Sequence, residues 1–241
     1  MNMQIINYLD ISAGSIVAVI GCGGKTSLIG LVSDKLRDKK VLVSATTKKF
    51  PVKGEGVMLC NTLRQCVEHE PQTGIQCFGL FNEKTGKLET LPEDILAGFM
   101  PQYDVVLLEA DGSRNLPCKG WREYEPVIPN YCTHTVGLVN MEAIGKTATE
   151  DTVLRLPEFL HLTGLREGAA ITEQAMTAMV CAPNGMFKNC AGGQYLLVNQ
   201  VEGDECICTA QSFLRSVKEK YPGRFKRLIY GSICLDTWHE L

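Results

Sequence analysis

Short apolar runs alternate along the chain with segments in which apolar residues recur at helical spacing. The runs have the length of buried strands and are rich in β-branched residues, so they predict strands. These strands lie at residues 15–20, 41–44, 56–60, 76–81, 105–108, 135–139, 195–198 and 227–233. The segments between them predict helices at residues 25–36, 62–68, 93–99, 152–162, 171–180 and 208–220. This alternation indicates an α/β fold with a mostly parallel sheet flanked by helices.

The connections between these elements refine the predicted fold. The strand, helix and strand between residues 15 and 44 form a βαβ unit, which predicts a parallel strand pair with a right-handed crossover. Polar residues and a glycine at 82–87 predict a hairpin turn, whereas three prolines within 117–129 predict an extended, irregular loop. We expect residues 1–241 to form one domain with a helical insertion around 148–185.

The composition is that of a globular protein, because 45% of the 241 residues are hydrophobic and 21% are charged. No apolar run approaches the ~20 residues needed to cross a bilayer, and the chain does not begin like a secretion signal, so we expect a cytoplasmic protein with no membrane partner. A net charge of −3 argues against a nucleic-acid partner held by a broad basic surface. The eleven cysteines include no C-x-x-C pair, so we expect reduced thiols rather than zinc ligands.

The strongest chemical motif follows the first predicted strand, where residues 21–26 read G-C-G-G-K-T. A phosphate chain needs inward-pointing N–H groups, small residues that let it approach, and the positive end of a helix. We expect the lysine, at an exposed helix start, to reach the β- and γ-phosphates and the threonine hydroxyl to bind Mg²⁺. The motif is a short form, with Val19 where the usual loop has its first glycine, and the alternative is a glycine turn that happens to precede a lysine. The residues predicted to hold the nucleotide are Gly21, Cys22, Gly23, Gly24, Lys25, Thr26 and Ser27.

The second motif is an apolar strand that ends in acids, V-V-L-L-E-A-D-G at residues 105–112. Opposite a phosphate loop, such a strand places carboxylates near a nucleotide-bound metal. We expect Glu109 and Asp111 to reach Mg²⁺ or its waters, and the N–H of Gly112 to approach the γ-phosphate. The E-x-x-G spacing resembles the switch element of the nickel and cobalamin accessory GTPases. Taken alone, the same residues would be a buried strand ending in an Asp-Gly turn.

The third motif, N-Q-V-E, follows the predicted strand at residues 195–198. GTPases use N-K-x-D here, where the lysine stacks on the base and the aspartate accepts hydrogen bonds from guanine. In this chain Asn199 is kept, Gln200 replaces the stacking lysine, and Glu202 replaces the aspartate with a longer side chain. We therefore expect ATP to bind at least as well as GTP.

Together these motifs resemble the YqeC family. The resemblance rests on the phosphate-loop motif, on E-A-D-G-S at residues 109–113 and on E-P-V-I-P at residues 125–129. Further matching residues are Thr46, Thr47, Lys119, Asn199, Gly231 and Ser232. The resemblance covers nearly the whole chain, although Tyr124 stands where we expect a histidine and residues 120–122 also depart from the pattern. The family is described as accessory to selenium-dependent molybdenum hydroxylases and selenium cofactor biosynthesis, which implies a molybdenum cofactor or a molybdenum hydroxylase as partner.

A second group of residues is a candidate for substrate contact or for a nucleotide-dependent switch. Its members are Thr46, Thr47, Ser113, Arg114, Lys119 and Glu125. The two threonines close the second predicted strand, together with the lysines at 48–49, at the edge where open α/β sheets bind ligands. A solvated exit from the strand would explain the same threonines.

The leading interpretation is a P-loop NTPase-like domain that binds ATP or GTP with Mg²⁺ and hydrolyses it. In this interpretation Lys25 neutralises the leaving phosphates, while Thr26 and Glu109 hold the metal. Asp111 also reaches the metal and orients the attacking water. Two alternatives stay open. The first is ATP-dependent activation of a small-molecule acid, or phosphoryl transfer of the kinase type, since the short loop also resembles that of the Mur ligases. The second is a non-catalytic nucleotide switch that delivers a cofactor.

Overall fold

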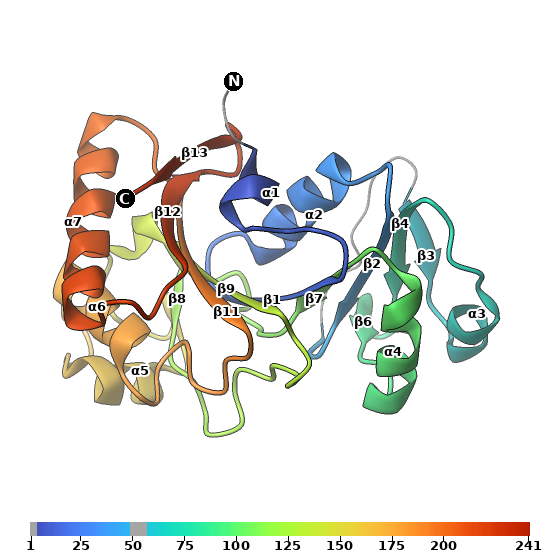
Figure 1. Cartoon of the computed structure of the whole chain (residues 1–241). Coiled ribbons are helices and arrows are strands. Elements are labelled where there is room, and N and C mark those ends of the chain that lie inside the picture. The colour runs from blue at the N-terminus through green and yellow to red at the C-terminus, as the bar shows by residue number, and fades with distance from the viewer. Residues whose placement is uncertain (1–3, 49–56) are drawn as a thin grey trace.

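The computed structural model describes residues 4–48 and 57–241, which are arranged around one large sheet (Figure 1). The strands of this sheet are β1 (Ser15–Gly21), β2 (Lys40–Ala45), β3 (Val57–Cys60), β4 (Gly74–Phe78), β7 (Val105–Glu109), β9 (His134–Asn140), β11 (Gly193–Asn199), β12 (Arg227–Ser232) and β13 (Thr237–Glu240). Within the described residues the order is β13-β12-β11-β9-β1-β7-β2-β4-β3, and only the β12–β13 pair is antiparallel. The predicted α/β fold with a mostly parallel sheet is confirmed.

The strands of two smaller pairs lie outside this sheet. β5 (Leu80–Asn82) and β6 (Lys87–Glu89) form an antiparallel hairpin, with the predicted turn between them. β8 (Cys118–Lys119) pairs in parallel with β10 (Val153–Leu154), so the predicted irregular loop at 117–129 contains a short strand that ties it to a later part of the chain.

Helices cover both faces of the large sheet (Figure 1). They are α1 (Ile5–Tyr8), α2 (Lys25–Lys35), α3 (Leu63–Glu68), α4 (Glu93–Phe99), α5 (Leu156–Thr163), α6 (Glu173–Cys181) and α7 (Asp204–Lys220). Short 3₁₀ turns follow α4 at Met100–Gln102 and β9 at Met141–Ala143. Because side chains alternate along a strand, Val17 and Val19 of β1 pack with α1 and α2, whereas Ala18 and Ile20 join the core with α4 to α7.

The neighbours of β1 differ from the predicted βαβ pair. β1 and β2 run parallel, but β7 lies between them and pairs with both. The predicted adjacency of β1 and β2 is therefore wrong, because the crossover through α2 leaves room for a strand from later in the chain. The consequence is that Glu109, at the end of β7, pairs with Val19 of β1 and so lies beside the glycine-rich turn.

Several element boundaries also differ from the prediction. The helix predicted from residue 152 begins at Leu156, because Val153–Leu154 is recruited as β10. The strand predicted over 76–81 ends as β4 at Phe78, and the chain then enters the hairpin. The predicted helix 208–220 begins earlier, at Asp204. Neither α1 nor β13 was predicted, and Gly56 of the predicted strand 56–60 lies outside the described residues.

Among the described residues, no helix combines the length and apolarity that a membrane crossing requires. The predicted helical insertion at 148–185 contains α5 and α6, and α6 lies against α7. These helices lie on the β9–β11–β12 side of the molecule, together with α7 (Figure 1).

Candidate functional site

The turn between β1 and α2 requires glycine at several positions. Gly21, Gly23 and Gly24 all have left-handed backbone conformations, with φ values of 93°, 89° and 117°. A Cβ atom on Gly23 would lie 2.5 Å from the Cβ of Asn140, and one on Gly21 would lie 2.2 Å from the carbonyl oxygen of Leu138. The turn is therefore packed closely against the end of β9, and a side chain at either position would displace it.

α2 begins at Lys25, directly after a glycine that has no side chain to cap the first turn. The Lys25 side chain is only 4% exposed, so the expectation of an exposed helix start is wrong. Its Nζ donates to the carbonyl oxygen of Gly21 at 2.7 Å and to the hydroxyl of Ser113 at 3.3 Å. The ammonium thus lies between the turn after β1 and the segment after β7.

Thr26 and Glu109 meet across the β1–β7 junction. The hydroxyl of Thr26 donates to Oε2 of Glu109 at 2.9 Å, and the Glu109 side chain is mostly buried. Both residues line the same cavity. A hydroxyl and a carboxylate at this separation present two hard oxygen atoms to one point.

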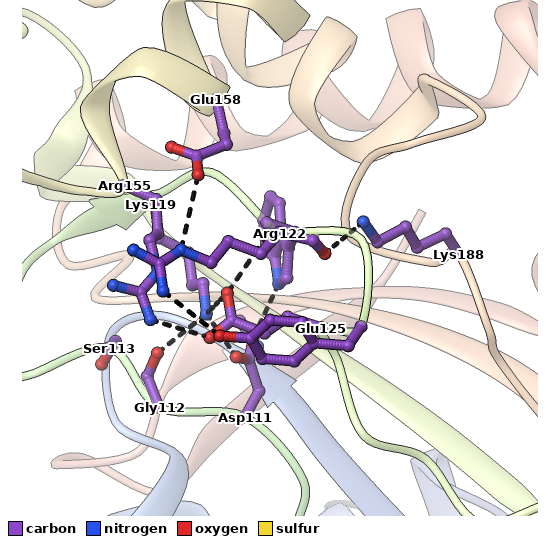
Figure 2. Close-up of polar contacts among 12 residues, drawn as sticks. Asp111, Gly112, Ser113, Lys119, Arg122, Glu125, Arg155, Glu158 and Lys188 are labelled. Atoms are coloured by element: carbon purple, nitrogen blue, oxygen red, sulfur yellow. Dashed lines mark hydrogen bonds and ion pairs between the residues drawn. The ribbon is translucent and has the colours of Figure 1, made fainter.

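Asp111 lies beneath the turn rather than on the cavity wall formed by the described residues. Its Oδ2 accepts from the N–H of Gly21 at 3.2 Å and from Nε1 of Trp121 at 2.8 Å, while its Oδ1 accepts from Nζ of Lys119 (Figure 2). The carboxylate is 1% exposed. Since both oxygens are used by protein donors, this placement argues against direct contact of Asp111 with a metal or a water in the cavity.

The residues after β11 close the other end of the cavity. The amide nitrogen of Asn199 donates to the carbonyl oxygen of Gly23 at 2.7 Å, and its oxygen accepts from the N–H of Ile233 at 2.9 Å. Glu202 accepts from the hydroxyl of Ser232 at 2.7 Å. Oε1 of Gln200 is buried and has no hydrogen-bond partner among the described residues. Asn199 therefore joins three strand ends, while Gln200 and Glu202 line this end of the cavity.

One cavity of about 900 Å³ brings many of the predicted residues together. Those that line it are Gly23, Gly24, Lys25, Thr26, Ser27, Glu109, Ser113, Asn199 and Glu202. The other predicted residues lie off its described wall: Gly21, Cys22, Thr46, Thr47, Asp111, Gly112, Arg114, Lys119 and Glu125. Thr46 instead donates to the carbonyl oxygen of Val127 at 2.6 Å, beside a separate, smaller cavity.

Some cavity residues were missed from the sequence. They are Asn115, Leu116, Pro117, Asn140, Glu142, Lys146, Cys206, Ile233 and Cys234. Asn140 ends β9 next to β1, so its place at the carboxyl end of a predicted strand was a signal that could have found it. Trp121 was noted only as a departure from a family pattern, although its indole N–H holds Asp111.

Cys22 contributes no reactive thiol to the site. Burial raises the pKa of its thiol to about 12, with the charge of Lys25 opposing the shift. The backbone N–H of Cys22 donates to the carbonyl oxygen of Leu138 at 3.0 Å. Both groups are therefore turned into the protein, and the turn offers the N–H groups that follow Cys22.

The fold and the cavity define an α/β protein with a polar site at the carboxyl edge of a parallel sheet. The family model described as YqeC protein matches residues 17–157. A protein of Escherichia coli (strain K12) with the name "Uncharacterized protein YqeC" is 30% identical over 185 residues, which cover 74% of this chain and 72% of that relative. The chain belongs to the YqeC family, as the motifs predicted. The matched region of the family model includes the glycine-rich turn and Glu109.

Proposed function

We propose that this protein binds a Mg²⁺–nucleoside triphosphate in the large cavity and hydrolyses it. The observation that supports the proposal is the meeting of three strand ends at one cavity. Lys25 and Thr26 follow β1, Glu109 ends β7, and Asn199 ends β11. In open α/β sheets, ligands bind outside the carboxyl ends of the strands.

The glycine-rich turn and the start of α2 would hold the phosphates. The first N–H groups of a helix have no partner within the helix, and here the residue before the helix is glycine. These N–H groups and the helix dipole favour an anion. The Lys25 ammonium lies at the same place and would exchange its contact with Ser113 for a phosphate oxygen.

The residues present fit a Mg²⁺ ion that arrives with the nucleotide. Mg²⁺ is usually held by one or two protein oxygens together with phosphates and water, and Thr26 and Glu109 supply such oxygens on the cavity wall. Among the described residues, no group of three or more His, Cys, Asp or Glu could hold a metal alone. When bound, Mg²⁺ would neutralise charge on the phosphates. Thr26 and Glu109 would therefore bind the metal, whereas Asp111 would hold the glycine-rich turn in place.

A nucleotide switch is the second candidate, favoured by the segment that follows Gly112. Arg114 and Asn115 both have left-handed backbone conformations, with φ values of 51° and 62°, which are costly for residues other than glycine. This segment is linked to the phosphate site through the Lys25–Ser113 contact. A phosphate that draws Lys25 away from Ser113 would release one anchor of a strained turn.

The family resemblance, rather than the geometry of the cavity, supports the pathway that we propose for this nucleotide turnover. We assign the protein to the maturation of molybdenum hydroxylases or of their selenium-containing cofactor, with the nucleotide supplying energy or timing. A small-molecule acceptor that accelerates turnover would favour activation of an acid or phosphoryl transfer, whereas a protein partner that does so would favour the switch.

Phosphate release by the pure protein tests the proposal, with ATP and GTP compared in the presence and absence of Mg²⁺. Thr26→Ala is expected to lower Mg²⁺-dependent turnover roughly tenfold or more, because it removes an oxygen that would hold the metal. Thr62→Ala is the matched control, since Thr62 caps α3 far from the cavity. Equal turnover by both variants, or no binding of either nucleotide by the wild type, would contradict it. Tight binding with slow turnover would favour the switch.

A further inference from the structure

Lys119 is a fully buried cation that the proposed chemistry does not use. Its side chain is 0% exposed, and it lies on β8, off the described wall of the nucleotide cavity. A buried ammonium is costly unless acceptors surround it. Its Nζ donates to Oδ1 of Asp111 and to the carbonyl oxygen of Gly112 at 2.8 Å, and it lies 3.8 Å from Glu125 (Figure 2). The same Nζ lies over the ring of Trp121.

These contacts link Lys119 to the two segments that carry cavity-lining residues, the glycine-rich turn and the segment after β7. Through Asp111, Lys119 is linked to the N–H of Gly21, the residue that opens the glycine-rich turn. Through the carbonyl oxygen of Gly112, it holds the backbone immediately before Ser113. Lys25 joins the same two segments a second time, because its Nζ donates to the carbonyl oxygen of Gly21 and to the hydroxyl of Ser113.

We infer that Lys119 is a positioning residue of the nucleotide site, which fixes the glycine-rich turn and the segment after β7 relative to each other. The contacts alone support the geometry, whereas the effect on nucleotide affinity rests on the proposed function. Lys119 would not touch the proposed nucleotide, because it lies off the described wall of the cavity. It sets the distance between the N–H groups of the turn and the hydroxyl of Ser113, and a site of fixed geometry binds a multiply charged ligand more tightly than a loose one.

A single substitution cannot separate this role from simple charge neutralisation. Lys119→Met leaves the Asp111 carboxylate buried without its cation, so it is expected to lower the melting temperature as well as nucleotide affinity. The double variant Lys119→Met with Asp111→Asn removes both charges. It should recover much of the melting temperature, yet Gly112 still lacks its donor, and Gly21 and Trp121 then donate to a neutral amide oxygen, which is a weaker acceptor than a carboxylate.

The experiment compares nucleotide binding and amide exchange in the wild type, Lys119→Met, the double variant and Phe213→Leu. Phe213 is a buried residue of α7 away from the cavity, so its substitution lowers stability without touching the site. Positioning predicts that the dissociation constant for Mg²⁺–ATP rises about tenfold or more in both Lys119 variants, including the thermally recovered one. The same variants should show faster exchange at the N–H of Gly21, whereas Phe213→Leu should change neither quantity.

The possible outcomes separate the two hypotheses. Affinity and exchange that return to wild-type values together with the melting temperature would overturn the positioning role and leave Lys119 as a counter-ion for Asp111. If the wild type binds no nucleotide, the proposed function fails. In that case, the rate of hydrogen exchange at the Gly21 amide still tests whether Lys119 fixes the turn. A wild-type rate in the double variant would overturn the inference, and a faster rate would support it.

Discussion

At the scale of single residues, Glu109 carries the largest share of the proposed metal chemistry. Glu109 and Asp111 are close in sequence, yet one lines the cavity and the other is engaged beneath the turn. Alternation along an extended segment does not separate them, because residues two apart share a face of a strand. They differ because the chain leaves β7 after Glu109 and Lys119 draws Asp111 inward.

Glu109→Gln should therefore weaken Mg²⁺-dependent nucleotide binding more than metal-free binding. The substitution keeps the shape of the side chain and its acceptor for Thr26, and removes only the charge that faces the metal. Calorimetric titration with and without Mg²⁺ should show a loss of roughly tenfold in the first case and little in the second. Glu89→Gln is the control, since Glu89 pairs with Lys48 away from the cavity. An equal loss with and without metal would make Glu109 structural.

Cys22 should resist alkylation in the native protein, although it lies within the candidate nucleotide loop. Burial raises its pKa to about 12, so at pH 8 the thiol stays protonated and inaccessible. Cys208 and Cys234 are exposed and serve as internal controls. Iodoacetamide followed by mass spectrometry should label both exposed cysteines in the native state, and Cys22 only after denaturation. Labelling of native Cys22 at a rate near that of Cys208 would show that the turn opens.

At the scale of elements, the segment between β7 and β9 links the large cavity to the helical region. Glu125 lies 3.2 Å from Arg155, which precedes α5, and 3.8 Å from Lys119 on β8. Burial raises the pKa of Glu125, but Lys119 and Arg155 outweigh it, so the pKa lies below its usual 4.5. The ionised form of Glu125 is thus favoured by the fold.

This pKa predicts a pH dependence of stability. A carboxylate with a lowered pKa stabilises the fold fully above the unfolded value near 4.5, and this contribution disappears as the pH falls through the lower folded value. The difference in free energy of unfolding between the wild type and Glu125→Gln should be largest above about pH 5.5 and shrink in acid. Urea titrations across this range measure it. Glu68→Gln, in an exposed pair with Arg64, should show little difference. A difference in free energy of unfolding between the wild type and Glu125→Gln that does not change with pH would contradict the lowered pKa of Glu125.

The elements that the sequence predicted well are those with a strong hydrophobic pattern. β1, β7 and β11 are apolar along most of their length, and α2 and α4 have clear helical spacing. β13 has one buried residue, Trp238, and α1 has one, Ile5, so neither carries a pattern long enough to detect. The order of strands could not be read from local pattern, because the place of β7 between β1 and β2 depends on contacts between distant segments.

The candidate site was predictable to the extent that its residues follow predicted strands. The glycine-rich turn, Glu109 and Asn199 were found in this way, because the carboxyl ends of parallel strands share one edge. The structural role of Asp111 beneath the turn could not be predicted in this way. It depends on Lys119 and Trp121, which come from a segment without periodicity. The burial of Lys25 likewise depends on Ser113 from another strand end.

At the scale of the whole molecule, residues that follow β11 and β12 together build the end of the cavity where the base of the proposed nucleotide would lie. Ser232 holds Glu202, while Gln200 presents an unpaired buried oxygen among the described residues. Guanine discrimination needs a carboxylate that accepts from two ring donors, and the longer side chain of Glu202 displaces that group. One well-placed bidentate contact contributes about 1–3 kcal/mol, or roughly 5- to 150-fold in affinity.

The expected base preference is therefore weak and favours ATP. We expect a competition titration to show ATP as the tighter ligand, and in no case a preference for GTP as large as about tenfold. Gln200 stands where guanine-specific proteins have a stacking lysine, and the contact of Ser232 directs the Glu202 carboxylate toward β12. GTP bound more than about a hundredfold more tightly would show that Glu202 reaches guanine despite its length.

Binding of Mg²⁺–nucleotide by the pure protein tests the central claim most directly. The measurement is calorimetric titration of the wild type and Lys25→Ala with a non-hydrolysable ATP analogue in the presence of Mg²⁺, with circular dichroism to verify the fold. The wild type should bind with a stoichiometry of one, and Lys25→Ala should lose roughly tenfold or more in affinity, because a charge-assisted contact to phosphate is removed. Equal affinity of the two proteins, or no binding by the wild type to ATP and GTP analogues alike, would contradict the nucleotide site.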